Sequence, residues 1–252
     1  MTTVLKLGGS VITDKDSPET LDEAALDAAL DAVADAWRDG GDSRGQGNLV
    51  IVHGGGSFGH HYADRYGVSR TAGTRDPEAI RAIHGAMKRL NTAVVDALAS
   101  VDVPVLPVHP MSAADRDGSG DLTLPTGGVE TMLKEGFVPV LHGDGVVHAD
   151  EGVTVLSGDE VVVALADALG ADRVGVCSAV EGVYDEDGDV IRRIETFDGA
   201  AGALGGSDAT DVSGGMTGKV RVLLDLGAPA HVFGLDGLKP FLDGGDPGTR
   251  IG

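Results

Sequence analysis

The sequence contains few cysteines, lysines and aromatic residues, and it lacks long apolar runs. Cys177 is the only cysteine, which excludes a disulfide within the chain and a zinc site built from four cysteines. No stretch approaches the roughly 18 apolar residues that a membrane-spanning helix needs. The first ten residues, MTTVLKLGGS, show no basic and then apolar leader. We therefore expect a soluble cytoplasmic protein.

Positive charge is also scarce, because 19 Lys and Arg stand against 40 Asp and Glu and give a formal net charge of −21. A surface this acidic repels nucleic-acid phosphates and anionic lipids, so we expect neither as a partner. The acids are spread along the chain, as in DEAALDAALDAVADAW, rather than gathered in one block. This pattern indicates a halophilic protein whose whole surface is adapted to concentrated salt. The alternative is an acidic protein from an organism that lives at ordinary salt.

Short apolar segments alternate with amphipathic ones along the chain. Buried strands are predicted at residues 3–7, 48–53, 103–108, 137–142, 172–177 and 229–234. Helices are predicted at residues 21–38, 76–99, 126–135, 159–170 and 216–227. A hairpin is predicted at 146–156, and polar or glycine-rich loops at 42–47 and 199–215, the second of which could also cover a ligand. The alternation predicts one α/β domain with a largely parallel sheet that helices cover on both faces.

Three of the six lysines lie in or beside glycine-rich places. Lys6 lies in KLGGS, Lys15 follows in VITDK, and Lys219 ends GGMTGK. Glycines let backbone N–H groups approach a phosphate closely, and lysine adds a full positive charge. Three such lysines in one cleft would bind a polyanion, whereas each alone could equally be a solvated surface charge.

The strongest local signal is HGGGSFGH at residues 53–60, directly after a predicted strand. It matches neither the dinucleotide fingerprint nor the P-loop pattern. His60 could donate to an anion held by the glycine loop, while His61 is interpreted as a surface or capping residue. The chain has no H-x-x-x-H pair, and four other histidines lack a partner at ligand spacing: His53, His109, His142 and His148. We therefore expect no metal site made by protein side chains.

Four motifs taken together resemble the amino acid kinase superfamily: KLGGS, HGGGSFGH, LSGD at 156–159 and GGMTGK at 214–219. Within it, Lys15 and His60 resemble the isopentenyl phosphate kinase family of the archaeal mevalonate route. The resemblance implies a three-layer αβα sandwich around a mostly parallel eight-stranded sheet. It also implies an N-terminal lobe, about 1–155, for a phosphate acceptor and a C-terminal lobe, about 156–252, for ATP. The implied activity is ATP-dependent phosphorylation of isopentenyl phosphate to isopentenyl diphosphate, by a homodimer, with Mg²⁺ bound mainly through phosphates.

The resemblance also implies roles for individual residues. The implied catalytic residues are Lys15, His60, Lys6, Lys219 and Asp159, with Lys15 stabilising the transition state and Asp159 orienting the other two lysines. The implied ATP-binding residues are Lys6, Leu7, Gly8, Gly9, Ser10, Gly56, Ser178, Gly215 and Lys219. The implied acceptor-binding residues are Gly54, Gly55, His60, Asp144, Gly145, Ser157 and Gly158.

One stretch departs from the family's pattern. Relatives tend to carry TDVDGVY after the strand at 172–177, whereas this chain has Ser178 and Ala179 at the first two positions. The loss of a carboxylate at 179 puts the nucleoside contacts and the preference for ATP in question. The phosphate chemistry is not affected. A phosphate monoester is already an anionic nucleophile, so no general base is required.

Two further expectations concern the acceptor. An isopentenyl tail needs an apolar pocket, and the helix at 76–99 offers Ile80, Ile83, Met87 and Leu90, of which we expect one or two to face it. Rival functions are another kinase of the superfamily, acting on an amino acid, carbamate, a nucleoside monophosphate or a phosphonate, and a non-catalytic nucleotide or oxyanion binder. His60 favours a phosphate acceptor, and the three lysines together favour catalysis.

Overall fold

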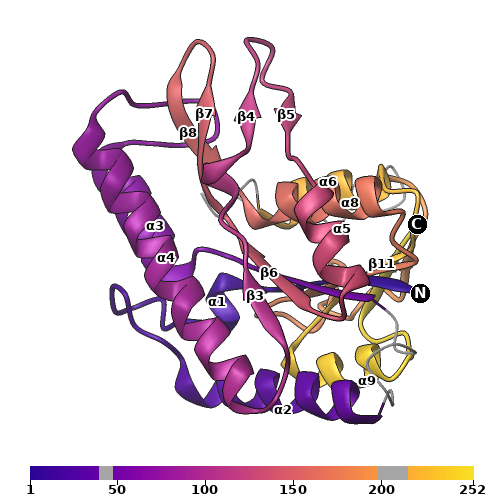
Figure 1. Ribbon diagram of the computed structural model, residues 1–252. Coiled ribbons are helices and arrows are strands. Elements are labelled where there is room, and N and C mark those ends of the chain that lie inside the picture. The colour runs from indigo at the N-terminus through magenta and orange to yellow at the C-terminus, as the bar shows by residue number, and fades with distance from the viewer. Residues whose placement is uncertain (40–47, 198–214) are drawn as a thin grey trace.

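The computed structural model describes residues 1–39, 48–197 and 215–252, which form a twisted sheet between two layers of helices (Figure 1). The predicted loop at 42–47 and nearly all of the predicted loop at 199–215 lie outside the described residues. The N- and C-termini lie near each other at one side of the sheet (Figure 1).

The described residues contain an eight-stranded main sheet in the order β10-β12-β11-β9-β1-β2-β6-β3. Its strands are β1 (Thr2–Leu7), β2 (Asn48–His53), β3 (Val105–Pro107), β6 (Val138–His142), β9 (Arg173–Cys177), β10 (Arg193–Ile194), β11 (Ala230–Phe233) and β12 (Thr249–Ile251). All neighbouring pairs are parallel except β11 and β12, which are antiparallel. The carboxyl ends of the central strands therefore meet at one edge of the sheet, as the prediction of a parallel sheet requires.

The alternation of side chains along each strand creates two cores, one on each face of the sheet. Leu5 and Ile51 pack against one helical layer, and their neighbours Val4 and Val50 pack against the other. The first layer holds α1 (Gly9–Ile12), α2 (Glu23–Asp39), α3 (Gly56–Tyr66), α4 (Pro77–Ser100) and α9 (Leu238–Leu242). The second holds α5 (Gly127–Lys134), α6 (Gly158–Leu169) and α8 (Gly215–Leu224). The predicted αβα sandwich is confirmed.

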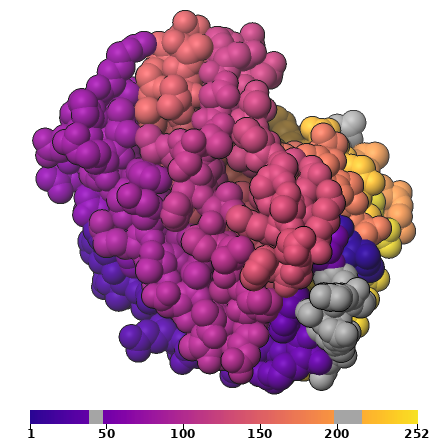
Figure 2. Space-filling model, in the orientation of Figure 1, coloured from indigo at the N-terminus to yellow at the C-terminus, as the bar shows by residue number. Residues whose placement is uncertain are grey.

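A second sheet of four strands, in the order β5-β4-β7-β8, stands above the main sheet (Figure 1). Its strands are β4 (Asp115–Arg116), β5 (Leu122–Thr123), β7 (Asp144–His148) and β8 (Gly152–Leu156). The hairpin of β7 and β8 was predicted, and β4 and β5 were not. The segment between α3 and α4 meets this hairpin at the top of the molecule (Figure 2). Thr74 and Val153 exchange two backbone hydrogen bonds of 2.9 Å there.

Local differences from the predicted elements have simple causes. The strand predicted at 103–108 is reduced to β3, an edge strand, because Pro104 and Pro107 have no N–H to donate. Helix α3 begins at Gly56, inside the stretch interpreted as a loop. Helix α4 begins as predicted, because the Asp76 side chain accepts a hydrogen bond of 2.9 Å from the Glu78 N–H. Two 3₁₀ turns, Pro110–Ser112 and Leu235–Gly237, complete the described elements.

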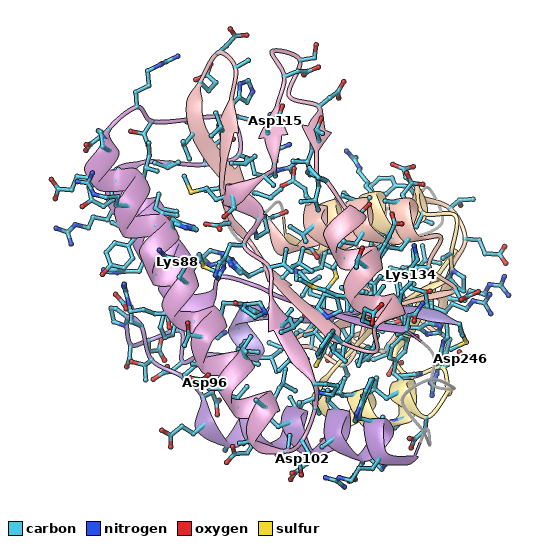
Figure 3. The ribbon with its side chains drawn as sticks, viewed as in Figure 1. Lys88, Asp96, Asp102, Asp115, Lys134 and Asp246 are labelled. Carbon is cyan, nitrogen blue, oxygen red and sulfur yellow. The ribbon has the colours of Figure 1, made fainter. Side chains whose placement is uncertain are left out.

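Acidic side chains point outward from several elements. Figure 3 labels six exposed charged residues on helices, strands and turns: Lys88, Asp96, Asp102, Asp115, Lys134 and Asp246. The distribution matches the dispersed acids of the sequence. None of the helices in the described ranges combines the length and the apolar character that crossing a bilayer requires.

Candidate active site

A cleft of about 650 Å³ opens at the carboxyl ends of the central strands. Most of the residues predicted to bind or react line it: Lys6, Gly8, Gly9, Ser10, Lys15, Gly54, Gly55, Gly56, His60, Asp144, Ser157, Gly158, Asp159, Ser178 and Lys219. Two do not, since Leu7 is fully buried in the core and Gly145 faces Val153 and Met111. Gly215 is the first residue of α8.

The helices α1, α3 and α6 begin at this cleft, and glycine is required where they approach one another. A Cβ on Gly9 would collide with the backbone nitrogen of Gly56, and one on Gly54 would lie 2.5 Å from the nitrogen of Gly9. Gly56 also has φ +47°, a left-handed conformation that glycine adopts at little cost. Gly158, at the start of α6, lies against Lys6, since its added Cβ would be 3.2 Å from Cε. The starts of α1 and α3 are thereby packed against each other, and the start of α6 is packed against Lys6.

These helix starts leave backbone donors open to the cleft. Within the described part of the chain, the N–H groups of Gly55, Gly56, Gly158 and Asp159 meet no protein acceptor. The N–H groups at the start of a helix carry partial positive charge and have no partner in the helix itself. Such groups bind anionic oxygens, and phosphates above all. The site therefore offers open amides, of the kind that suits anionic oxygens, in addition to its lysines.

Lys6 and Asp159 form the central ion pair, with 2.7 Å between Nζ and Oδ1 and with side chains that are 7% and 14% exposed. Burial alone would raise the pKa of the Asp159 carboxyl, but the charges of Lys6 and Lys219 hold that pKa below its ordinary value. Asp159 is therefore ionised and attracts both lysines from the first turn of α6. The arrangement agrees with the orienting role that the resemblance implies for Asp159.

Lys15 lies on the segment between α1 and α2, and the side chain of Glu19 binds that segment to α3 and α4. The Glu19 carboxylate accepts hydrogen bonds of 2.8 Å from Arg89 Nε and Nη2 and of 2.5 Å from Tyr62 Oη. The bond from Arg89 is the main reason that the pKa of Glu19 is lowered. Glu19 itself has φ +50°, which few residues other than glycine adopt. Side-chain contacts to two helices thus hold Lys15 beside the cleft.

Sequence reasoning missed several residues of the cleft. His61 lines it together with His60, and both are exposed. Exposure and position alone therefore do not show which of the two histidines would contact an anion. Arg70 also lines it, 3.1 Å from Glu160 Oε1, and its charge helps to lower the pKa of Asp159. Glu160 is bonded more closely to Arg116, at 2.7 Å. Arg70 follows α3 without a glycine cluster or other motif, so no local pattern indicated it.

An apolar wall adjoins the lysines and open amides of the cleft. Ile83 and Met87, on α4, line the cleft together with Val155 and Leu156. Leu90 is instead fully buried in the core, and Ile80 is not part of the lining. Two of the four α4 side chains considered for the acceptor's tail therefore line the cleft. Polar donors and a small apolar surface therefore share one cavity.

The last strand end at the cleft belongs to β9. Its Cys177 carbonyl accepts a hydrogen bond of 2.9 Å from the Gly8 N–H, and the following Ser178 N–H donates to Phe233. The Cys177 thiol is fully buried, and burial raises its pKa to about 12. No group of three or more His, Cys, Asp or Glu residues in the described ranges is arranged to hold a metal ion. The open amides and lysines fit ATP phosphates, which would themselves supply most ligands of Mg²⁺.

Comparison with known proteins agrees with this geometry. Residues 1–232 match the model of the amino acid kinase family. The isopentenyl phosphate kinase of Haloferax volcanii is 62% identical over 248 residues, which cover 98% of this chain and 97% of that protein. The enzyme of the same name from Methanocaldococcus jannaschii is 33% identical, covering 88% of this chain and 86% of its own.

Solved structures give the same result. A crystal structure of an isopentenyl phosphate kinase superimposes with a TM-score of 0.82 and 28% identity, over all of both chains. Carbamate kinase from Giardia, with a TM-score of 0.68 and 14% identity over 99% of this chain and 98% of its own, shares the fold alone. The chain therefore belongs to the amino acid kinase family, and within it to the isopentenyl phosphate kinases.

Proposed function

We propose that this protein transfers the γ-phosphoryl group of ATP to isopentenyl phosphate and so forms isopentenyl diphosphate for isoprenoid biosynthesis. The observation that carries the proposal is the cleft itself, where open helix N-termini and three lysines lie beside the apolar wall of Ile83 and Met87. The donors suit two phosphate groups, and the wall suits a short branched hydrocarbon. The name and high identity of the Haloferax relative support the same substrate.

The reaction brings the phosphate of the acceptor and the γ-phosphate of ATP together, although both are anions. Phosphoryl transfer depends mainly on alignment and on the stabilisation of charge, so lysines and amides can supply what the step needs. Lys6 and Lys219 would hold the phosphates of ATP, and Lys15 would contact the transferring group. Mg²⁺ bound through those phosphates would supply further positive charge. The acceptor's own phosphate oxygen attacks, which agrees with a glycine loop that carries no catalytic carboxylate.

His60 would hold the acceptor's phosphate. It lies on α3, one turn beyond the open N–H of Gly56, and is exposed to the cleft. An imidazolium beside a phosphate would form a charge-assisted hydrogen bond with it. His61 lines the same cleft but stacks edge-on against Tyr62, at 5.0 Å between ring centroids. We assign the acceptor to His60 and use His61 as the control.

Several wider properties belong to the same proposal. The segment of about 1–155 forms the acceptor lobe and that of about 156–252 the ATP lobe, within one domain. The protein acts as a homodimer in the cytoplasm of a halophile, with ATP and Mg²⁺ as its cofactors. The charge of −21 supports the halophilic origin, and the remaining properties agree with the family.

The test is an ADP-release assay in molar KCl with ATP, Mg²⁺ and a panel of acceptors: isopentenyl phosphate, UMP, acetylglutamate and carbamate. Isopentenyl phosphate should be the preferred substrate. Loss of one charge-assisted hydrogen bond in His60→Ala should weaken acceptor use roughly ten- to a hundredfold and leave ATP affinity nearly unchanged. His60→Gln should recover part of this, and His61→Ala should have little effect. Turnover of another acceptor but not of isopentenyl phosphate would disprove the proposal.

A further inference from the structure

Two neighbouring strands of the main sheet end in the same way at the cleft. Strand β2 ends at His53 and is followed by Gly54, and β6 ends at His142 and is followed by Gly143. The two strands are adjacent and parallel, and His53 lies directly opposite His142 in their register. Both side chains are fully buried, and their rings stack with 5.4 Å between centroids. Both glycines line the cleft.

Each histidine makes the same bond to the peptide that follows its strand. Nδ1 of His53 lies 3.1 Å from the Gly54 carbonyl oxygen, and Nδ1 of His142 lies 2.8 Å from that of Gly143. A carbonyl oxygen only accepts, so the proton of each imidazole must be on Nδ1. The proton on Nδ1 determines the tautomer of both rings.

The other ring nitrogen of each histidine has a partner of the complementary kind. His53 Nε2 lies 3.1 Å from the amide nitrogen of Asn91, a fully buried residue of α4. His142 Nε2 lies 2.8 Å from His109 Nδ1. Both partners can donate, so each Nε2 accepts and each ring is neutral. Burial lowers the pKa of His53 to about 4 and that of His142 to about 3, which also keeps both rings neutral.

The bond from a histidine to a glycine carbonyl also orients the next N–H. In a trans peptide the C=O and N–H groups point in opposite directions. The Gly54 carbonyl points at the buried His53, so the N–H of Gly55 points away from it. That N–H is one of the donors without a protein acceptor in the described part of the chain. The Gly143–Asp144 peptide is fixed in the same way, directly before the fully buried carboxylate of Asp144, which is 3.0 Å from His84 Nδ1.

We propose that His53 and His142 are a matched pair of positioning residues, whose Nδ1–H groups fix the two peptides that shape the acceptor's phosphate site. The proposal rests on the proposed function, because it assigns the amide of Gly55 to that phosphate. Neither histidine contacts the substrate. Their neutrality leaves the positive charge of the cleft on its lysines and on Arg70.

The test compares a variant that keeps the donor with one that removes it. In His53→Asn the amide nitrogen lies near the position of Nδ1 and can still donate to Gly54, whereas His53→Leu fills the space without a donor. We expect His53→Leu to raise the KM for isopentenyl phosphate about tenfold, with a much smaller effect on the KM for ATP. His53→Asn should recover most of the loss. The same pair of substitutions at His142 should follow the same order.

His231 provides the matched control. It is 1% exposed and lies on β11 of the same sheet, but it is not part of the cleft. His231→Leu should leave the KM for the acceptor unchanged. Equal losses in the Asn and Leu variants, or losses shared equally between the acceptor and ATP, would overturn the proposal.

The wild-type protein gives a second test that does not depend on whether a variant folds. Histidine labelled with ¹⁵N should show a protonated Nδ1 and a bare Nε2 for His53 and His142, and the opposite tautomer in either ring would overturn the proposal. The Gly55 amide should shift when isopentenyl phosphate or inorganic phosphate is added, and an unmoved Gly55 amide would also overturn it. Wild-type protein that binds phosphate at Gly55 but does not turn over isopentenyl phosphate would refute only the proposed function.

Discussion

Acid should destabilise this protein well above the pH at which carboxylates titrate, because His53 and His142 are buried as neutral rings. A histidine whose pKa is lower in the folded than in the unfolded state favours unfolding as the pH falls below the unfolded value, about 6.5. The contribution of the two neutral rings to the free energy of unfolding is fully present above that pH. It is lost progressively as the pH falls toward the folded pKa values of about 4 and 3. Between pH 7.5 and 5 each ring then costs about 2 kcal/mol, or about 4 kcal/mol together.

The measurement is the free energy of unfolding in urea, at a fixed molar concentration of KCl that screens the change in net charge. Wild-type protein should lose about 4 kcal/mol between pH 7.5 and 5 through this pair. The double variant His53→Asn, His142→Asn should lose little of that amount, and each single variant about half of it. His231 also has a lowered pKa, and its contribution should remain in every protein compared.

The comparison concerns the dependence on pH and not the absolute stability, so a variant that is weaker at every pH still gives an answer. A double variant with the same loss as the wild-type protein would show that the two rings do not titrate between the folded and unfolded states. That result would refute the reasoning from burial.

Three further predictions follow from the cleft and the surface. Lys15→Ala should lower kcat more than it weakens ATP binding. The loss of transition-state stabilisation should be about 2.7–4 kcal/mol, as is typical of a lost electrostatic contact, and an unchanged kcat in steady-state kinetics would show that Lys15 does not act in the site. Glu19→Gln should also lower kcat, by about fivefold or roughly 1 kcal/mol because Glu19 and Arg89 are partly exposed, with circular dichroism as the check on folding. The melting temperature should rise with KCl, since the Debye length falls from about 30 Å at 10 mM to about 3 Å at 1 M; a constant value would contradict adaptation to salt.

The glycine-rich part of the cleft could be predicted from the sequence because its signals are local. Gly8, Gly54 and Gly158 each lie within a short motif, and each motif follows a strand whose apolar pattern is clear. In a parallel sheet the carboxyl ends of neighbouring strands meet, so motifs far apart in the chain could be placed in one cleft. The scarcity of lysine then made Lys6 and Lys219 conspicuous.

The supporting residues could not be predicted, because their partners come together only in the folded chain. Glu19 gains its role from Arg89 and Tyr62, which lie on two other helices. His53 was considered only as a possible metal ligand, since the sequence does not show that its strand lies beside β6. The helical start of α3 was missed for a related reason, because Gly56 and Gly59 are unfavourable in an isolated helix and this helix is held by its neighbours.

Chemical labelling of the single buried thiol, Cys177, can measure how often the centre of the sheet opens. With a pKa of about 12, only about one Cys177 thiol in ten thousand would be ionised at pH 8, even if reagent could reach it. Reaction with a thiol reagent must therefore wait until the centre of the sheet separates and the side chain regains ordinary acidity. The labelling rate measures how often that separation occurs. Because Gly8 is bonded to the Cys177 carbonyl, phosphates bound to the adjoining amides should slow labelling in proportion to their affinity.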